Sequence, residues 1–191
     1  MACVEFLICQ IILYRRFMMK TVVLLLFCLL ISSADDKYIP WEAERKLTWD
    51  DFTGPADMET SSKAYTWSKI SMGWDCEDNV FKLNAVAKFD KSRSWKKDVF
   101  TPALLAHEQL HFDITELYAR KMRAHFATLP NACKLTTEEV KAQSQKILDA
   151  WTARQDQYDQ ETRHSKEKEE QARWELLIAK ELKSLSKYAA P

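Results

Sequence analysis

The stretch that most constrains the fold begins at Thr101-Pro102, because no glycine or proline follows Pro102 until Pro130. Threonine is a good N-cap, and proline fits the first helical position, where its missing N–H costs nothing. We therefore expect one long helix over residues 102–129. Because no helix breaker interrupts it, we expect this long helix to be the element on which the rest of the fold packs.

A second helix start is indicated by Thr136-Thr137-Glu138-Glu139, which has the spacing of a capping box. No glycine or proline follows before Ala190. Because about 50 residues in one helix would not suit a small domain, we expect a break near residues 162–165 and a third helix after it. The buried stripe of that third helix is predicted to comprise Trp174, Leu177, Ile178, Leu182 and Leu185.

The residues before Thr101 have the period of strands instead. Apolar and polar side chains alternate along one run whose apolar members are Phe81, Leu83, Ala85, Ala87 and Phe89. Residues 65–74 are rich in threonine, isoleucine and aromatics, and the polar stretch 75–79 between the two runs predicts a β-hairpin. Residues 47–52 predict a further short strand. The fold class is therefore α+β, with a small N-terminal antiparallel sheet packed on a long helix and two further C-terminal helices.

The N-terminus has the pattern of an export signal. Residues 21–31 form an uncharged apolar run that follows Arg15, Arg16 and Lys20 and precedes the small residues Ser32 and Ala34. The run is too short for a comfortable membrane span. We expect residues 1–34 to be a signal peptide, with translation starting at residue 1, 18 or 19, and residues 35–191 to form one periplasmic or secreted domain without a stable membrane span.

The balance of charged residues limits the classes of molecule that the chain is expected to bind. The chain has 28 basic and 28 acidic side chains, so no overall field attracts nucleic acid, and we expect no nucleic-acid partner.

After removal of residues 1–34, the cysteines that remain are Cys76 and Cys133. An oxidising compartment permits a disulfide between them, although no spacing rule requires that they meet.

The segment His107-Glu108-Gln109-Leu110-His111 lies within the predicted long helix. At about 100° per residue the two histidines are separated by about 40° around the axis and by one turn along it, so both imidazoles can reach one ion. Apolar residues flank them on the helical projection, so the pair belongs to the buried stripe. A metal offsets the desolvation of these polar groups, which favours Zn²⁺ over two hydrogen-bonded core histidines.

A catalytic zinc usually takes a third protein ligand and leaves one position for water. Within the same helix Asp113 and Glu116 point away from His107, and His125 lies about 21 Å along the axis beyond His111. We therefore predict His164, at the expected helix break, as the third metal ligand. The reserve ligands are Asp159 and Glu161.

Three stretches of the chain resemble a family of secreted bacterial proteins, domain-of-unknown-function family 922, whose members are predicted to be zinc-dependent proteases. The matching residues are 47–52 (LTWDDF), 104–114 (LLAHEQLHFDI) and 158–164 (YDQETRH). The resemblance implies a zincin-like metallohydrolase and implies that the segment 158–164 helps to build the site. It thereby supports His164.

The function predicted from these features is that of an exported zinc-dependent peptidase, in which Glu108 is the general base for a zinc-activated water. Tyr158 or Tyr118 is expected to donate a hydrogen bond to the developing oxyanion. The substrate is a peptide or protein, held in an extended form by an exposed strand edge for which residues 91–97 are a candidate.

Two other classes of protein are also consistent with the sequence. The pairs Glu108-x-x-His111 and Glu161-x-x-His164 match the E-x-x-H signature of di-iron carboxylate proteins, which also require a glutamate from each of two further helices. A non-catalytic, metal-containing binding module would not need Glu108 as a base. The sequence has no feature that sets an oligomeric state.

Overall fold

The computed structural model describes residues 37–98 and 100–190. The predicted signal peptide and the alternative translation starts lie outside the described residues. From Lys37 onward the chain forms one unit, which is described by itself below.

A long antiparallel hairpin dominates the sheet. Strands β3 (Ser68–Glu77) and β4 (Val80–Asp90) pair along their whole length, in a register that runs from Ser68 opposite Phe89 to Glu77 opposite Val80. The turn residues Asp78 and Asn79 have φ values of 51° and 61°, a left-handed conformation that Asp and Asn tolerate well. The predicted hairpin is therefore confirmed.

Three very short strands complete the β structure. Strand β1 (Tyr38–Pro40) pairs with the end of β4, which gives the order β1-β4-β3, and β2 (Ala64–Tyr65) pairs with β5 (Trp95–Lys96) in a separate two-stranded sheet. The prediction of a strand over residues 47–52 is wrong. Trp49–Asp51 forms a 3-10 turn, η1, because the Asp51 carboxylate accepts a hydrogen bond from the Thr48 N–H at 2.8 Å and thereby competes with strand pairing.

The three predicted helices are present. They are α2 (Pro102–Thr128), α3 (Thr137–Thr162) and α4 (Lys168–Ser184), and short 3-10 turns, η2 (Ala132–Lys134) and η3 (Ser186–Tyr188), follow α2 and α4. The expected caps also form, since the Thr101 side chain accepts from the Leu104 N–H and Thr136 and Glu139 make a capping box. The break between α3 and α4 falls where the sequence predicts it.

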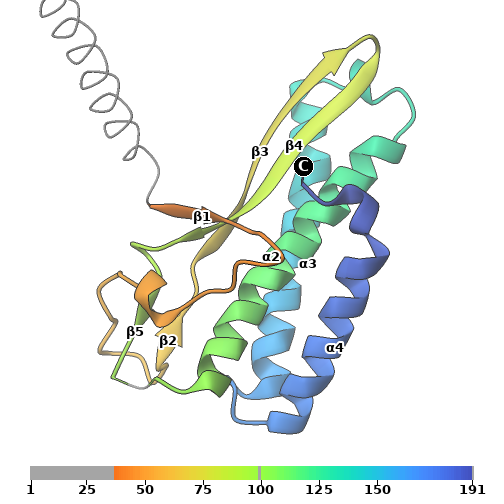
Figure 1. Ribbon diagram of the computed structural model, residues 1–191. Coiled ribbons are helices and arrows are strands. Elements are labelled where there is room, and N and C mark those ends of the chain that lie inside the picture. The colour runs from red at the N-terminus through yellow and green to blue at the C-terminus, as the bar shows by residue number, and fades with distance from the viewer. Residues whose placement is uncertain (1–36, 99, 191) are drawn as a thin grey trace, which may run out of the picture. The chain divides into compact units, whose positions relative to one another are not determined.

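Helix α2 is the centre of the packing. Figure 1 shows the three helices side by side, with the β3–β4 hairpin laid along α2, and α2 contacts β3 and β4 as well as α3 and α4. Fully buried side chains of α2 include Ile114, Leu117 and Met122, while Trp174 and Ile178 of the predicted α4 stripe pack against the same helix. The α+β class and its layout are confirmed.

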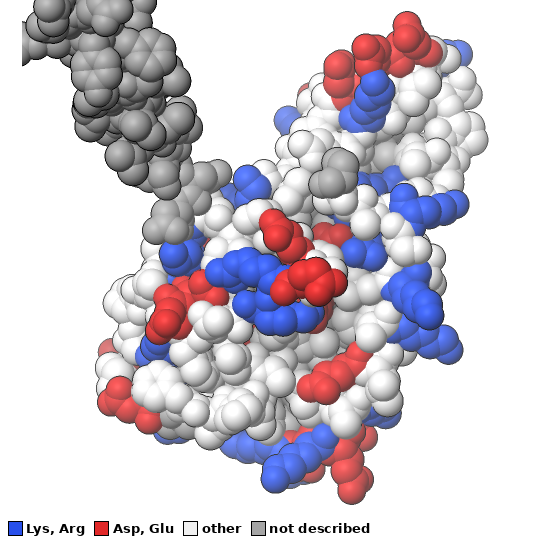
Figure 2. Space-filling view, viewed as in Figure 1, with Lys and Arg blue, Asp and Glu red and all other residues white. Residues whose placement is uncertain are grey.

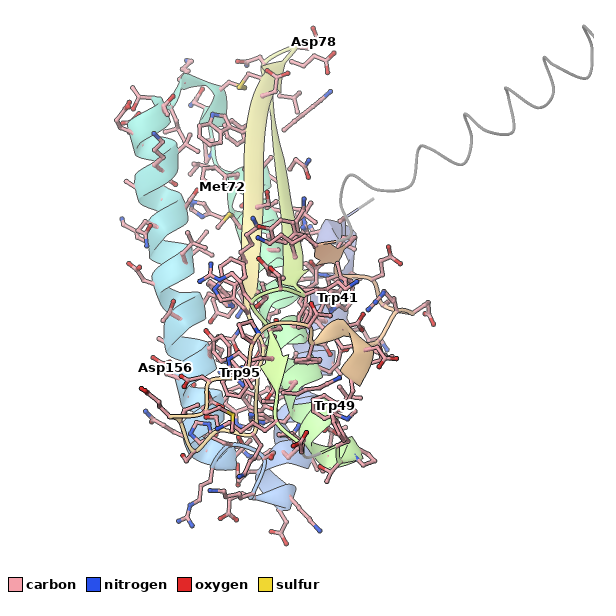
Figure 3. The ribbon with its side chains drawn as sticks, turned by 90° about the vertical axis from the view of Figure 1, so that its left-hand side faces the viewer. Trp41, Trp49, Met72, Asp78, Trp95 and Asp156 are labelled. Atoms are coloured by element: carbon pink, nitrogen blue, oxygen red, sulfur yellow. A yellow bond between two sulfur atoms is a disulfide. The ribbon has the colours of Figure 1, made fainter. Side chains whose placement is uncertain are left out.

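A disulfide joins the hairpin to the helical layer. Cys76, near the end of β3, is bonded to Cys133 in η2, with Cα atoms 5.7 Å apart. In Figure 3 the hairpin tip at Asp78 lies at the opposite end of the structure from Asp156 of α3. The covalent link therefore fixes the end of the molecule that is remote from Asp156.

Charged side chains of both signs are mixed on one face of the molecule. Figure 2 shows Lys and Arg interspersed with Asp and Glu on the face in view, and acidic side chains gathered at the end of the hairpin. No helix of the described residues combines the length and apolar character needed to cross a membrane.

One glycine is required by a close approach of two backbone segments. A Cβ atom on Gly54 would lie 2.7 Å from the carbonyl oxygen of Ser92 and 2.9 Å from that of Ser94, whereas a Cβ on Gly73 would meet nothing within 4 Å. We expect Gly54→Ala to lower the free energy of unfolding by about 2 kcal/mol, because backbone must shift to relieve the overlap. Urea denaturation checks this, with Gly73→Ala as the control. Equal stability of the two variants would contradict it.

Candidate metal centre

Three ligand atoms meet where α3 crosses the start of α2. The Nε2 atoms of His107 and His111 lie 3.2 Å apart, and Oδ1 of Asp159 lies 3.1 Å from the first and 3.2 Å from the second. Ligand atoms bound to one tetrahedral zinc at about 2.0–2.1 Å are about 3.3 Å from one another. Within the described residues this is the one group of three or more ligating side chains. The triangle therefore has the dimensions of one face of a zinc site.

The ring of His111 is oriented by a glutamine. Its Nδ1 lies 2.7 Å from Oε1 of Gln155, one turn before Asp159 on α3. The Gln155 amide nitrogen donates to the backbone carbonyl oxygen of His111 at 2.9 Å, so the amide oxygen must face the ring and accept from its Nδ1–H. In the neutral ring of His111 the lone pair is thereby placed on Nε2, inside the triangle.

A second glutamine orients His107 in the same way. Nδ1 of His107 lies 3.3 Å from Oε1 of Gln171, a buried residue of α4. The Gln171 amide nitrogen donates to Glu175 at 3.0 Å, and the Tyr158 hydroxyl donates to the same Oε1 at 2.7 Å. This pattern again identifies Oε1 as the acceptor, so the lone pair of a neutral His107 ring lies on Nε2.

Two imidazole nitrogens and a carboxylate oxygen thus face one another in a mostly buried position, where either a metal ion or protons on the imidazoles can balance the charge of Asp159. The pKa shifts describe the group when protons on the imidazoles balance that charge. Burial alone would lower the pKa of His111, but the hydrogen bond to Asp159 and the charges of Glu108 and Asp159 raise it above its ordinary value. Burial would raise the pKa of Asp159, yet the hydrogen bonds from His107 and His111 hold it well below its usual range. Once the Nε2 atoms have lost their protons, the two imidazoles and the Asp159 carboxylate form a donor set that suits zinc.

The predicted third ligand, His164, lies beside this group. Its Nδ1 is 3.1 Å from Oδ1 of Asp159, but its side chain is 64% exposed, and it does not belong to the set of ligand atoms within 4.8 Å of one another. Asp159, a reserve ligand in the sequence prediction, supplies the third atom of the group instead. The reason is that Asp159 still lies on the helical face of α3 that packs on α2, whereas His164 follows the end of that helix.

The other reserve ligand, Glu161, points away from the centre. Its carboxylate accepts hydrogen bonds from Trp174 at 2.8 Å and from Gln157 at 2.8 Å. Glu161 and His164 therefore do not act as a second E-x-x-H pair facing His111. Glu116 is also engaged elsewhere, since its carboxylate pairs with Arg120 and Arg123.

Glu108 lies next to the triangle and is only 3% exposed. Its Oε2 accepts a hydrogen bond from the Thr66 hydroxyl at 2.6 Å, and the same hydroxyl lies 3.2 Å from the Glu108 carbonyl oxygen. Thr66 belongs to the link between β2 and β3. This link therefore holds the carboxylate that the sequence predicts as the general base.

Tyr158 does not lie where the predicted oxyanion contact needs it. Its ring is fully buried and stacks on His107 with centroids 4.7 Å apart, and its hydroxyl is used by Gln171 and by the His107 carbonyl oxygen, 3.3 Å away. Burial raises the pKa of this phenol. Tyr118 is likewise part of the core. Because neither ring lines the cleft, Tyr158 positions the histidines from behind, a role that sequence reasoning missed together with Gln155 and Gln171.

An open cleft of about 760 Å³ leads to the ligand triangle. One wall is the extended segment 61–69, which includes β2, and the other is the face of α3 that carries Trp151, Gln155 and Asp159. His164 and Lys166 line one part of the rim. The segment 91–97, predicted as a substrate-binding edge, does not line this cleft, because β5 pairs with β2 instead.

Comparison with known proteins connects this site to a family. The model of a family described as "Bacterial protein of unknown function (DUF922)" matches residues 51–165, more than half of the chain. The chain belongs to the DUF922 family. The match includes His107, Glu108, His111 and the segment 158–164, so the three ligand atoms all come from the DUF922 region, while Gln171 follows it. No curated protein and no solved structure matches the chain.

The role of the glutamines can be measured directly. We expect Gln155→Leu to weaken zinc affinity by roughly 10–100-fold, because the His111 ring loses the acceptor that fixes its tautomer and direction. Competition with a chromophoric chelator gives the dissociation constant. The matched control is Gln145→Leu, since Gln145 is an exposed glutamine of α3 that bonds only Asp149. Equal affinity of the two variants would contradict the assigned role of Gln155.

Proposed function

We propose that this DUF922 member is an exported, zinc-dependent peptidase. The observation that supports this proposal most strongly is the triangle of His107 Nε2, His111 Nε2 and Asp159 Oδ1, with separations of 3.1–3.2 Å, beside the buried carboxylate of Glu108. His107, His111 and Asp159 would hold the ion. A three-ligand set that opens on a cleft leaves room for water and substrate, as catalytic zinc sites require.

The chemistry follows from the residues around the ion. When bound, zinc lowers the pKa of a coordinated water toward about 7 and polarises a carbonyl group. Glu108 accepts the proton of the attacking water and later delivers it to the nitrogen of the leaving amine. Thr66, whose hydroxyl donates to Oε2 of Glu108 at 2.6 Å, keeps one carboxylate oxygen fixed so that the other is free for the proton.

An extended peptide fits the wall formed by β2. Just before that strand, the Lys63 carbonyl accepts from the Lys97 N–H at 2.7 Å, so Lys63 and Tyr65 direct their main-chain groups toward β5. Backbone groups of alternate residues point to opposite edges of a strand, so those of Ala64 and Thr66 face away from β5. Both residues line the cleft. A substrate backbone can therefore add to this edge by main-chain hydrogen bonds.

Export is supported by a separate feature. The bond between Cys76 and Cys133 is of a kind that persists in oxidising compartments such as the periplasm or the extracellular space. This agrees with the signal-like pattern of residues 21–34.

The proposal is tested by incubating the purified protein with an unfolded protein such as reduced casein in water enriched in oxygen-18. We expect mass spectrometry to find internal cleavage products that carry one oxygen-18 atom in each new carboxyl group. Chelation of the metal should abolish cleavage, and one equivalent of zinc should restore it. If the folded, zinc-loaded protein cleaves neither casein nor any member of a mixed peptide library, the peptidase proposal is wrong.

A further inference from the structure

The cleft extends along α3 beyond the ligand triangle. Trp151, Gln155 and Asp159 follow one another at intervals of four residues, so they share one face of α3, and all three line the cleft. Asp159 supplies a ligand atom, and Gln155 bonds the ring of His111. Trp151 lies two turns before Asp159, about 12 Å along the helix axis. One arm of the cleft therefore runs from the ligand triangle to Trp151.

A buried hydroxyl group fixes the indole ring of Trp151. The Nε1 atom donates to Oγ1 of Thr115 at 3.2 Å, and the Thr115 side chain is fully buried. The same hydroxyl donates to the His111 carbonyl oxygen at 3.0 Å and lies 2.7 Å from the hydroxyl of Ser68, the first residue of β3. The polar edge of the indole thus faces the protein interior. The ring is half-buried and borders the cleft, so the surface it offers there is apolar.

The polar side chains beside Trp151 are engaged within the protein. Gln155 bonds both the ring and the carbonyl oxygen of His111. The Thr152 hydroxyl donates to a carbonyl oxygen one turn earlier in α3 at 3.2 Å, and the Ser68 hydroxyl bonds the buried threonine. A substrate side chain that enters this arm of the cleft therefore meets mainly the aromatic surface of Trp151.

Two charged residues of the cleft lining, Lys69 and Asp156, do not share this surface. Successive side chains of a strand point to opposite faces, so Lys69 points away from the face on which Ser68 contacts α2. Its Nζ atom lies 4.0 Å from the centroid of the Tyr38 ring. Asp156 is exposed and lies about 140° around α3 from Trp151. This arm of the cleft thus favours an apolar substrate side chain over a charged one.

The wall formed by residues 61–69 sets the distance of Trp151 from the scissile bond. Thr66 bonds Glu108, the proposed base, whereas Ser68, two residues further on, bonds the threonine that holds Trp151. Two residues of extended chain span about 7 Å, and the interval along α3 is about 12 Å. An extended peptide advances about 3.3 Å per residue, so it reaches Trp151 two to four residues from the scissile bond.

We propose that Trp151 is a specificity-determining residue, whose indole ring packs against a large apolar side chain of the substrate two to four residues from the scissile bond. This inference rests on the proposed peptidase function. The preferred substrates are peptides with an aromatic or long aliphatic residue at that position. Burial of such a side chain stabilises the complex, and a ring that is already fixed loses little side-chain entropy on binding.

The test compares two reciprocal variants, Trp151→Gln and Trp151→Phe. Glutamine removes the aromatic surface and keeps an N–H donor for Thr115, whereas phenylalanine keeps an aromatic surface and loses the donor. A mixed peptide library is digested, and mass spectrometry of the products gives the residue preference at each position. We expect wild type to prefer Phe or Leu over Ser by roughly 10–100-fold in kcat/KM at one position two to four residues from the cut.

The preference should fall to within about threefold in Trp151→Gln and should largely persist in Trp151→Phe. The matched control is Trp49→Gln, since Trp49 is also a half-buried tryptophan but does not line the cleft. It should keep the preference of wild type. Zinc content equal to that of wild type shows that each variant is folded.

A binding measurement separates this inference from the proposed function. Glu108→Gln is expected to bind peptides without cleaving them, so fluorescence anisotropy of labelled peptides that carry Phe or Ser at one position gives the dissociation constants. The peptide with Phe at the preferred position should bind roughly 10–100-fold more tightly than its Ser counterpart. Adding Trp151→Gln should remove most of this difference.

The possible outcomes bear differently on the two proposals. A preference that persists unchanged in Trp151→Gln, or that is confined to the two residues flanking the cut, would overturn the role of Trp151 while the peptidase proposal stands. Apolar-selective binding that depends on Trp151, in a protein whose wild type hydrolyses nothing, would reject the peptidase proposal and leave the binding role of Trp151 in place. A wild type that neither binds nor cleaves any peptide would reject both.

Discussion

Glu108→Gln is expected to lower the rate of peptide hydrolysis by roughly 10²–10⁴-fold while one zinc ion stays bound. The substitution keeps the size of the side chain and an oxygen that can accept from Thr66, which donates to Glu108 at 2.6 Å. It removes only the ability to take a proton from water. Steady-state kinetics and zinc analysis of the same protein sample give both quantities.

The matched control for that experiment is Glu161→Gln. Glu161 also belongs to an E-x-x-H sequence pair, but its carboxylate is bonded to Trp174 and Gln157 and does not line the cleft. We expect its hydrolysis rate to equal that of wild type. An unchanged rate in Glu108→Gln would contradict the proposed mechanism and favour another base, and an unchanged biological effect without turnover would favour a binding module.

Replacing both disulfide cysteines, Cys76→Ser with Cys133→Ser, is expected to lower the free energy of unfolding by about 4 kcal/mol. The bond closes a loop with a sequence separation of 57 residues, and cross-links of that length reduce the entropy of the unfolded chain by this amount in the loop-closure description. The melting temperature should fall by roughly 10 °C, since about 1 kcal/mol corresponds to 2–4 °C in a chain of this size. Thermal unfolding followed by circular dichroism checks the shift.

A reducing agent supplies the control for the disulfide. It should lower the melting temperature of the wild type to that of the double serine variant and should leave the variant unchanged. Zinc affinity should stay near the wild-type value, because the disulfide lies near the hairpin end and away from the ligands on α2 and α3. Equal stability of wild type and variant under oxidising conditions would show that the bond does not constrain the chain.

The helices and the hairpin follow from local rules, which is why the sequence predicts them. Thr101-Pro102 and the capping box at Thr136 and Glu139 satisfy helix ends through side chains a few residues away, and the alternation of residues 81–89 is complete within one strand. Strands β1, β2 and β5 have only two or three residues, too few to show a period. Their pairing depends on the surrounding tertiary structure, so no local pattern reveals them.

In the site as well, residues related by local spacing can be predicted from the sequence, whereas residues brought together by tertiary packing cannot. One helix carries the proposed ligands His107 and His111 and the proposed base Glu108, and a projection of about 100° per residue relates them. The choice between Asp159 and His164 depends on which side of α3 packs on α2, and that is a tertiary property. Gln155 lies one helical turn before Asp159. This spacing places both residues on one face of α3, and it could have identified Gln155 as a residue of the site. Gln171 comes from α4, and no spacing rule links it to His107.

The zinc content of the purified protein tests the central claim most directly. The protein is prepared without chelators, supplied with zinc, dialysed, and analysed by mass spectrometry for metal per chain, beside His107→Ala and Asp159→Ala. We predict one zinc per wild-type chain and loss of most of it from both variants, with Gln145→Leu retaining the full amount. A folded wild type that retains no zinc, or variants that retain as much zinc as wild type, would contradict a metal centre built from His107, His111 and Asp159.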